Sequence, residues 1–174
     1  HVLEHVLDPV ALLREIRRIM KADGVVYVEV PNAGGWSAEV FGGHWLAYDV
    51  PKHLVHFTPD SLQAVASKAG LQCVVERHMS WEHSPVTLLQ SFLSAWLGGH
   101  HLLFRSVSHE ASVATRVSFR WALHLSVALV CAIPAAIMSW WLALSKRGDT
   151  LGAFFRIDPR ASHRGMTALE REEV

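Results

Sequence analysis

Histidines and carboxylates gather in two short segments of this chain, and these residue types can do acid–base chemistry. Asp49 and His53 lie four residues apart in a long loop that is rich in tryptophan, histidine and glycine. A histidine that titrates near neutral pH can accept the proton of a hydroxyl group, and a nearby carboxylate can orient its ring. The alternative is that both side chains only hydrogen-bond the loop to itself. His53 and Asp49 are the first candidates for catalytic residues.

The second segment is the opening of the chain, which reads His1-Val2-Leu3-Glu4-His5. Imidazoles and a carboxylate at this spacing could bind a metal ion. The interpretation we favour is structural, with Glu4 as a carboxylate at the entry of a helix and His5 as a buried histidine. No metal site is therefore predicted. Glu4 and His5 remain candidates for catalytic residues.

Local signals predict the elements that must position these residues. Asp8 is a good N-cap and Pro9 suits the first helical position, and Gly24 is expected to end this helix as a C-cap. The nearly unbroken β-branched run of residues 25–30 predicts a parallel strand that is buried on both faces. Asn32 follows this strand at its carboxyl end, where open α/β sheets bind ligands.

Further elements follow along the chain. Thr58 and Pro59 predict the start of a second helix, which Gly70 should end. Residues 71–79 and 150–157 are expected to be strands, and residues 159–174 are polar and predicted to be a disordered tail. The order of helices and strands predicts an α/β fold.

Two motifs occur in this order along the chain: His1-Val2-Leu3-Glu4-His5-Val6-x-Asp8-Pro9 and Phe41-Gly42-x-x-Trp45-x-x-x-Asp49-x-Pro51-Lys52-His53-Leu54-x-x-Phe57-Thr58. Together they resemble the second half of class I S-adenosylmethionine-dependent methyltransferases. The resemblance covers residues 1–80 and resumes at residues 148–151. The first motif also resembles ubiquinone O-methyltransferases, which carry Glu-x-x-Glu-His and a divalent metal where this chain has His1 in place of the first Glu. The second motif resembles a subgroup found beside cell-envelope glycan genes.

The resemblance implies the C-terminal half of a Rossmann-like sheet, with S-adenosylmethionine as cofactor and His1 beside it. The Gly-rich loop that holds the methionine part of the cofactor, and the acidic residue that holds its ribose, are expected to lie outside this chain. Residues 1–174 alone are therefore expected to be inactive and to bind the cofactor without useful affinity. An upstream strand ending in Gly-x-Gly-x-Gly would support this class.

On the substrate side, the candidates are Asn32, Trp45 and Lys52. Trp45 could form an aromatic wall with Trp36 and Tyr48 against a sugar or ring, although aromatic residues in a loop can also be ordinary packing. Lys52 could contact a phosphate or simply be a solvated charge. The expected reaction is methyl transfer to an O or N of a lipid-linked or envelope glycan, with a quinone-type ring as the second choice. The alternative is a catalytically inactive membrane adaptor with the same fold.

Composition points to a membrane rather than to nucleic acid. The formal net charge is +0, which gives no bulk attraction to nucleic acid, and 51% of the residues are hydrophobic. The two cysteines have no metal-ligand spacing, which is typical of a reducing cytosolic setting. Residues 1–82 and 148–158 are expected to form the methyltransferase part, and residues 83–147 an apolar helical insertion.

The insertion contains a run of 24 uncharged residues, 121–144, which would be about 36 Å long as a helix. That length can span a bilayer. Pro134 should kink this helix, and a polar stripe in residues 86–104 predicts an interfacial helix or one that faces a partner helix. If the flanking strands share one sheet, an odd number of crossings is excluded. The choices are a two-helix hairpin, a kinked platform on the cytoplasmic face of the inner membrane, or a lid packed on the soluble domain or on a dimer partner.

Overall fold

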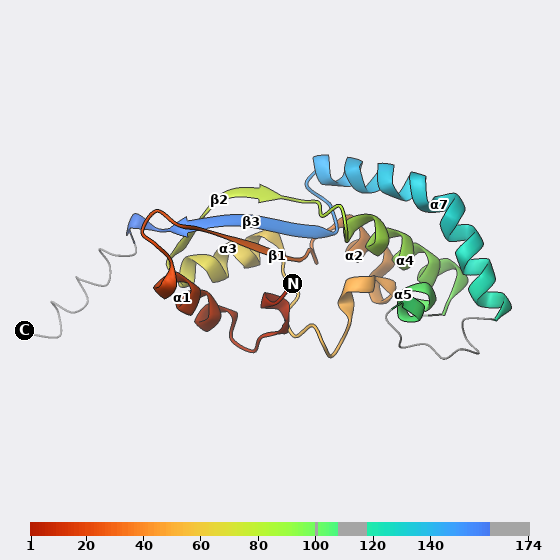
Figure 1. The fold of residues 1–174 in the computed structure, drawn as a ribbon, viewed down its shortest axis with the longest axis horizontal. Helices are drawn as coiled ribbons and strands as arrows, with labels where there is room; N and C mark the ends of the chain where they lie inside the picture. The colour runs from red at the N-terminus through yellow and green to blue at the C-terminus, as the bar shows by residue number, and fades with distance from the viewer. Residues whose placement is uncertain (100, 108–117, 161–174) are drawn as a thin grey trace, which may run out of the picture.

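The chain forms an elongated α/β structure, with a small sheet and two helices at one end and a group of helices at the other (Figure 1). The computed structural model describes residues 1–99, 101–107 and 118–160. Most of the predicted disordered tail, residues 161–174, lies outside the described residues.

Three strands form the sheet in the order β1-β3-β2. They are β1 (Val25–Pro31), β2 (Leu71–Arg77) and β3 (Thr150–Ile157), and both outer strands pair antiparallel with β3. β1 and β2 therefore run in the same direction on either side of a reversed central strand. The predicted last strand and the apolar helix before it are both present, so the mixed α/β fold is confirmed.

β1 corrects one expectation, because it is neither paired with a parallel strand nor buried on both faces. Val28 and Val30 are buried, but Val25 is 59% exposed and Tyr27 is 44% exposed. The reason is that the helices cover one face of the sheet only. On the other face the ring of Tyr27 lies 4.7 Å from that of Phe154. Strand type was predicted correctly from β-branching, but burial depends on what packs against each face.

Helices α1 (Pro9–Ile19) and α3 (Pro59–Lys68) form the layer under the sheet (Figure 1). Asp8 caps α1 by accepting a hydrogen bond from the Ala11 N–H at 2.9 Å, and Thr58 and Ser61 form a capping box on α3. Gly24 is not the C-cap of α1, because the helix already ends at Ile19 and Met20 is the capping residue. The two helices and the sheet enclose a core that includes Leu13, Val30, Leu62, Leu71, Leu151 and Phe155.

The other end of the molecule is built from helices and short turns. A 3₁₀ turn, η1 (Leu3–His5), opens the chain. The segment after β1 contains α2 (Trp36–Phe41), η2 (Gly42–His44) and η3 (Leu46–Tyr48). The apolar insertion forms α4 (Ser84–Leu97), α5 (Leu102–Val107) and α7 (Phe119–Leu144).

The polar stripe of α4 faces residues 42–48 and α5, and its residue Gln90 accepts a hydrogen bond from the Phe104 N–H of α5 at 3.3 Å. The hydroxyl of Ser91 accepts a hydrogen bond from the Leu46 N–H at 2.9 Å, and the Ser94 hydroxyl lies 3.2 Å from His44 Nδ1. This stripe therefore holds the segment that carries candidate site residues. The spacing of the polar residues on α4 was predicted correctly. The groups that these residues contact belong to this chain.

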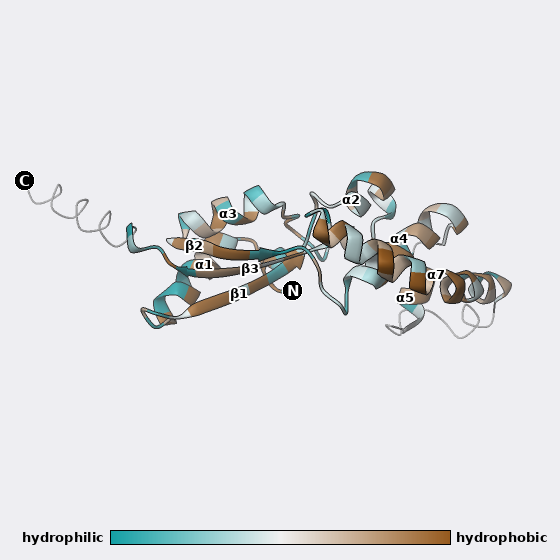
Figure 2. Ribbon diagram, turned by 90° about the horizontal axis from the view of Figure 1, so that it is seen from above, coloured by the Kyte–Doolittle hydropathy of each residue, from teal (hydrophilic) through white to brown (hydrophobic). Residues whose placement is uncertain are grey.

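α7 is the long apolar helix that the uncharged run predicts, and it packs along α4. Pro134 lies in its interior, and Figure 1 shows that the helix changes direction along its length, as a proline in a helix interior predicts. Figure 2 shows that most of its residues are hydrophobic. Among the described residues, it is the one helix long and apolar enough to cross a membrane.

Candidate active site

A pocket of about 860 Å³ lies where the sheet meets the helical end of the molecule. Its walls come from the opening of the chain, the end of β1, the loop of residues 43–53, helices α4 and α5, and the start of β3. This volume is in the range of small-molecule sites. The predicted site residues on its wall are His1, Trp45, Asp49, Lys52 and His53.

His53 is held in one orientation by a backbone carbonyl. Its Nδ1 lies 2.7 Å from the carbonyl oxygen of Ala47. A carbonyl can only accept, so Nδ1 must carry the proton in this hydrogen bond. In the neutral ring Nε2 therefore keeps its lone pair and can accept a proton. This is the arrangement that a general base needs.

His5 is anchored in the same way and lies beside His53. Its Nδ1–H donates to the carbonyl of Lys52 at 2.8 Å, and the two imidazole rings are 4.7 Å apart. The carbonyl of Glu4 accepts hydrogen bonds from the N–H groups of Leu54 and Val55, at 2.8 and 3.1 Å. Backbone pairing therefore brings the opening of the chain to the loop that carries His53.

Glu4, His5 and His53 form a cluster at this junction. One ligand atom from each lies within 4.8 Å of the other two. The Glu4 side chain is 1% exposed, and its Oε2 has no hydrogen-bond partner among the described residues. Two imidazoles with anchored Nδ1 atoms and a carboxylate could hold a divalent cation, or they could share protons with a substrate.

Glu4 is ionised at neutral pH despite its burial. Burial acts to raise the pKa of Glu4, but the hydrogen bond with His1, a backbone hydrogen bond and the charges of His1 and His53 together lower it. The charge of His53 is among the causes that lower the pKa of Glu4, so the two groups interact electrostatically. Glu4 can therefore support a positive charge that develops on His53.

Asp49 does not orient His53. Its carboxylate lies 3.6 Å from Lys52 Nζ, while the Ala47 carbonyl occupies the His53 Nδ1 position. Asp49 contributes through its backbone, because its carbonyl accepts hydrogen bonds from the N–H groups of Lys52 and His53 at 2.8 and 3.1 Å. The predicted carboxylate–histidine pair is thus replaced by a carbonyl–histidine pair.

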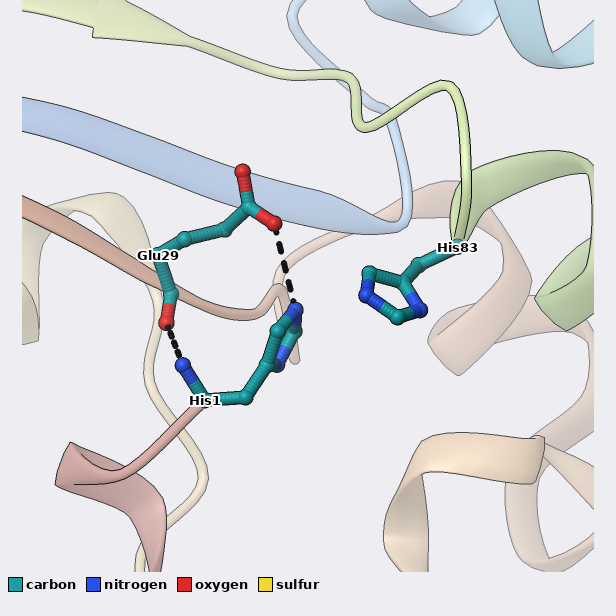
Figure 3. Close-up of side chains that lie close together, drawn as sticks. All are labelled: His1, Glu29 and His83. Atoms are coloured by element: carbon teal, nitrogen blue, oxygen red, sulfur yellow. Dashed lines mark hydrogen bonds and ion pairs between the residues drawn. The ribbon is translucent and has the colours of Figure 1, made fainter.

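His1 lines the pocket and lies between the carboxylates of Glu4 and Glu29, and Figure 3 shows it beside Glu29 and His83. Its Nδ1 is 3.2 Å from Glu4 and its Nε2 is 3.2 Å from Glu29, and its ring centroid is 4.4 Å from that of His83. The hydrogen bond with Glu4 is the largest cause that raises the pKa of His1, and burial opposes it. His1 lines the pocket, and its place beside the cofactor stays a prediction.

Asn32 is placed away from the pocket wall. The residue is 1% exposed, its amide nitrogen donates to the Gly148 carbonyl at 2.8 Å, and its amide oxygen accepts from the Gly34 N–H at 3.1 Å. The side chain is committed to backbone groups that join the end of β1 to the start of β3. This placement supports a structural role and not the predicted contact with substrate.

The aromatic residues divide between two hollows. Trp45 and Tyr48 line the main pocket, with ring centroids 5.4 Å apart, and Trp45 is nearly fully buried. Trp36 instead lines a separate apolar hollow of about 250 Å³ between α2, α4 and α7. The aromatic wall of the main pocket is therefore Trp45 and Tyr48 without Trp36. Lys52 is exposed at the mouth.

Asp149 is a pocket residue that the sequence interpretation missed. It precedes β3, is 2% exposed, and burial raises its pKa to about 6, while Ser37 and Trp45 act to lower it. The signal was available, because an acidic residue directly before a buried strand is unusual. It lies within the Gly148–Leu151 part of the resemblance but was given no role.

Comparison with known proteins gives a family match for the first part of the chain. No curated protein matches the chain. Residues 1–76, which include α1, β1, the loop with His53, α3 and most of β2, match the family described as Methyltransferase domain. This match supports a class I S-adenosylmethionine-dependent methyltransferase.

Proposed function

We propose that this protein transfers a methyl group from S-adenosylmethionine to an oxygen or nitrogen of a lipid-linked or envelope glycan, with His53 as the general base. The methyltransferase family match supports the type of reaction. The observation that carries the proposal is the fixed tautomer of His53, which leaves the Nε2 lone pair available at a pocket of about 860 Å³.

The chain's own residues account for the proton in this reaction. When bound, S-adenosylmethionine supplies a methyl group on a positively charged sulfur. The acceptor hydroxyl gives its proton to His53 Nε2 as the bond between its oxygen and the methyl carbon forms and the bond between sulfur and that carbon breaks. The Ala47 carbonyl keeps Nδ1 protonated, and Glu4 stabilises the imidazolium that results.

The charges around the pocket are of both signs. The carboxylates of Glu4 and Glu29 flank His1, which lines the pocket, and they raise the pKa of His1. The wall itself carries Asp49 and Asp149 together with Lys52 and Arg105. Trp45 and Tyr48 also line the pocket, with ring planes at 81°, and they offer an edge-to-face aromatic pair to a sugar or another ring.

Calorimetry with the full-length protein tests the proposal against the inactive adaptor. We expect S-adenosylmethionine to bind, and no binding heat would leave the adaptor as the better explanation. Transfer of a radiolabelled methyl group to fractionated envelope lipids tests the acceptor. Label in the lipid-linked glycan fraction supports the substrate class, whereas label in the quinone fraction would replace it with the aromatic ring.

We further propose that α7 lies on a membrane surface. A stripe of its apolar side chains is exposed at helical spacing, and Val130 and Ile133 are 77% and 73% exposed. Arg120 stands near its start, and Lys146 and Arg147 follow its end, where they could meet anionic headgroups. The exposed stripe consists of Leu129, Val130, Ile133, Ile137, Trp140, Trp141 and Leu144.

The sheet favours a surface position over a crossing. β2 and β3 pair directly, so the chain leaves and re-enters the sheet on one side of any membrane. A hairpin would need a second spanning helix, and α4 has 14 residues, fewer than the roughly 17 that a span requires. Because α7 is the one candidate span in the described part of the chain, these facts support a monotopic platform.

Vesicle binding tests this platform. Replacing Val130 and Ile133 together by glutamate should weaken binding to phosphatidylglycerol-containing vesicles by more than about tenfold, because each side chain contributes about 1.5 kcal/mol or more when buried. A matched control replaces Ile19 and Val25, which are exposed apolar residues at the sheet end. Equal binding by the two variants would refute the platform, as would a monomer that leaves membranes in plain buffer without detergent.

A further inference from the structure

Three buried polar side chains interact at the pocket without completed hydrogen bonds, and two of them, Asp149 and Trp45, line it. Asp149, Ser37 and Trp45 are 2%, 0% and 1% exposed. Both carboxylate oxygens of Asp149, the Ser37 hydroxyl and the Trp45 indole nitrogen lack a hydrogen-bond partner among the described residues. Buried polar groups seldom remain unpaired, and a small approach or one bridging water would pair these with each other.

These groups interact with one another electrostatically. The Ser37 hydroxyl and the Trp45 indole N–H act on the Asp149 carboxyl and favour its ionised form, against the effect of burial. Both are donors, and an ionised carboxylate is an acceptor only. Asp149 is therefore the natural acceptor for two donors that come from α2 and from the residue before η3.

Asp149 is also held firmly by the sheet. Its carbonyl accepts the Asn32 N–H at 2.9 Å, and the neighbouring Gly148 carbonyl accepts the Asn32 side-chain amide at 2.8 Å. The next residue, Thr150, begins β3 and pairs with Pro31 in β1. The carboxylate thus projects from a fixed part of the fold toward Trp45.

Trp45 leads directly to the group that orients His53. The Trp45 carbonyl accepts the Tyr48 N–H at 3.1 Å, which closes the η3 turn. Ala47 lies inside this turn, and its carbonyl accepts the His53 Nδ1–H at 2.7 Å. Trp45 and the Ala47 carbonyl therefore belong to one closed turn, which links the position of Trp45 to the group that orients His53.

We propose that Asp149 is a positioning residue, which fixes Trp45 and, through the turn of residues 45–48, fixes the Ala47 carbonyl that sets the tautomer of His53. The relevance of this coupling to catalysis rests on the proposed function. The coupling itself is a property of the folded chain and needs neither cofactor nor acceptor.

The charge state of Asp149 should control this coupling. Among the described residues, the causes that shift its pKa to about 6 are burial, Ser37 and Trp45. Protonation turns one of the two acceptor oxygens into a donor, so one of the two contacts with Ser37 and Trp45 should weaken as the pH falls below this value. The titratable or charged side chains that share the pocket wall are His1, Asp49, Lys52, His53, His83, His101 and Arg105.

Nuclear magnetic resonance of the chain with ¹⁵N-labelled tryptophan and histidine tests the proposal. The Trp45 indole signal, assigned by its loss in Trp45→Phe, should shift between about pH 5 and pH 8 with a midpoint near the Asp149 pKa of about 6. This shift should disappear in Asp149→Asn and persist in Asp60→Asn, which changes an exposed acid on α3.

The histidine signals then separate positioning from simple structural support. Asp149→Ala should lose the Nδ1–H tautomer of His53, whereas Asp149→Asn should keep it, because the amide oxygen still accepts from Trp45. A Trp45 indole signal that does not titrate, or that titrates equally in Asp149→Asn, would overturn the proposal. So would an unchanged His53 tautomer in folded Asp149→Ala. The wild-type titration decides the matter even if Asp149→Ala does not fold, and failure of methyl transfer is measured separately.

Discussion

His53→Ala should lower turnover of the full-length protein by about 10²–10⁴-fold and leave its affinity for S-adenosylmethionine unchanged. The imidazole accepts the proton of the acceptor, so its loss removes an interaction that exists in the transition state and not in cofactor binding. The expected loss has the size of general-base catalysis. Turnover should be measured with saturating cofactor, and cofactor affinity should be measured by calorimetry on the same preparation.

His56→Ala is the matched control for this variant. His56 belongs to the same loop, and its ring centroid is 6.4 Å from that of His53, but its Nε2 is bonded to the Tyr48 carbonyl at 3.0 Å. It is not among the residues that line the pocket. Its removal should change turnover little. Unchanged turnover in His53→Ala, or an equal loss in both variants, would remove His53 from the mechanism.

Local sequence signals predicted the elements that carry the site. For α3, Thr58 supplies the cap, Pro59 occupies the first turn, and Gly70 takes a positive φ of 75° just after the helix. The bounds of β3 agree with the predicted residues 150–157. Each of these signals acts over a few neighbouring residues, so the start and end of the element can be read from the local sequence.

The residues that fix the site were harder to find because their causes are long-range. The partner of His53 is the carbonyl of Ala47, and a backbone carbonyl leaves no mark in the residue types. Asp49 has the right chemistry and spacing, but its side chain lies by Lys52. Asp149 is about a hundred residues from Trp45 in sequence, and only the paired sheet and the buried stripe of α4 bring the two together.

Asn32 is a residue whose predicted role differs from its contacts in the structure. A polar residue at the carboxyl end of a strand is a reasonable ligand contact in an open α/β sheet. Here its amide instead satisfies the Gly148 carbonyl and the Gly34 N–H. Buried backbone groups at the junction of β1 and β3 need partners, and Asn32 supplies them.

Asp149→Asn should stabilise the folded chain by up to about 3 kcal/mol above neutral pH and by little near pH 4. Burial raises the pKa of Asp149 from 3.8 to about 6, a shift of about two units, and each unit corresponds to about 1.36 kcal/mol. The raised pKa means that the folded state prefers the neutral carboxyl. The buried neutral carboxyl therefore contributes stability to the folded state that is fully present below pH 3.8. This stability is lost as the pH rises through about 6 and the carboxyl ionises.

Asparagine has nearly the same shape and does not ionise, so the variant keeps the stability that the wild type loses. Urea unfolding at about pH 4 and pH 8 measures the difference, which should grow with pH, while Asp60→Asn should show no such growth. A constant difference at both pH values would mean that Asp149 does not titrate in this range.

An ionised, buried Asp149 thus costs stability at the pH at which His53 must act as a base. Such a cost is typical of functional sites, because a residue that only supported the fold would be better served by the amide.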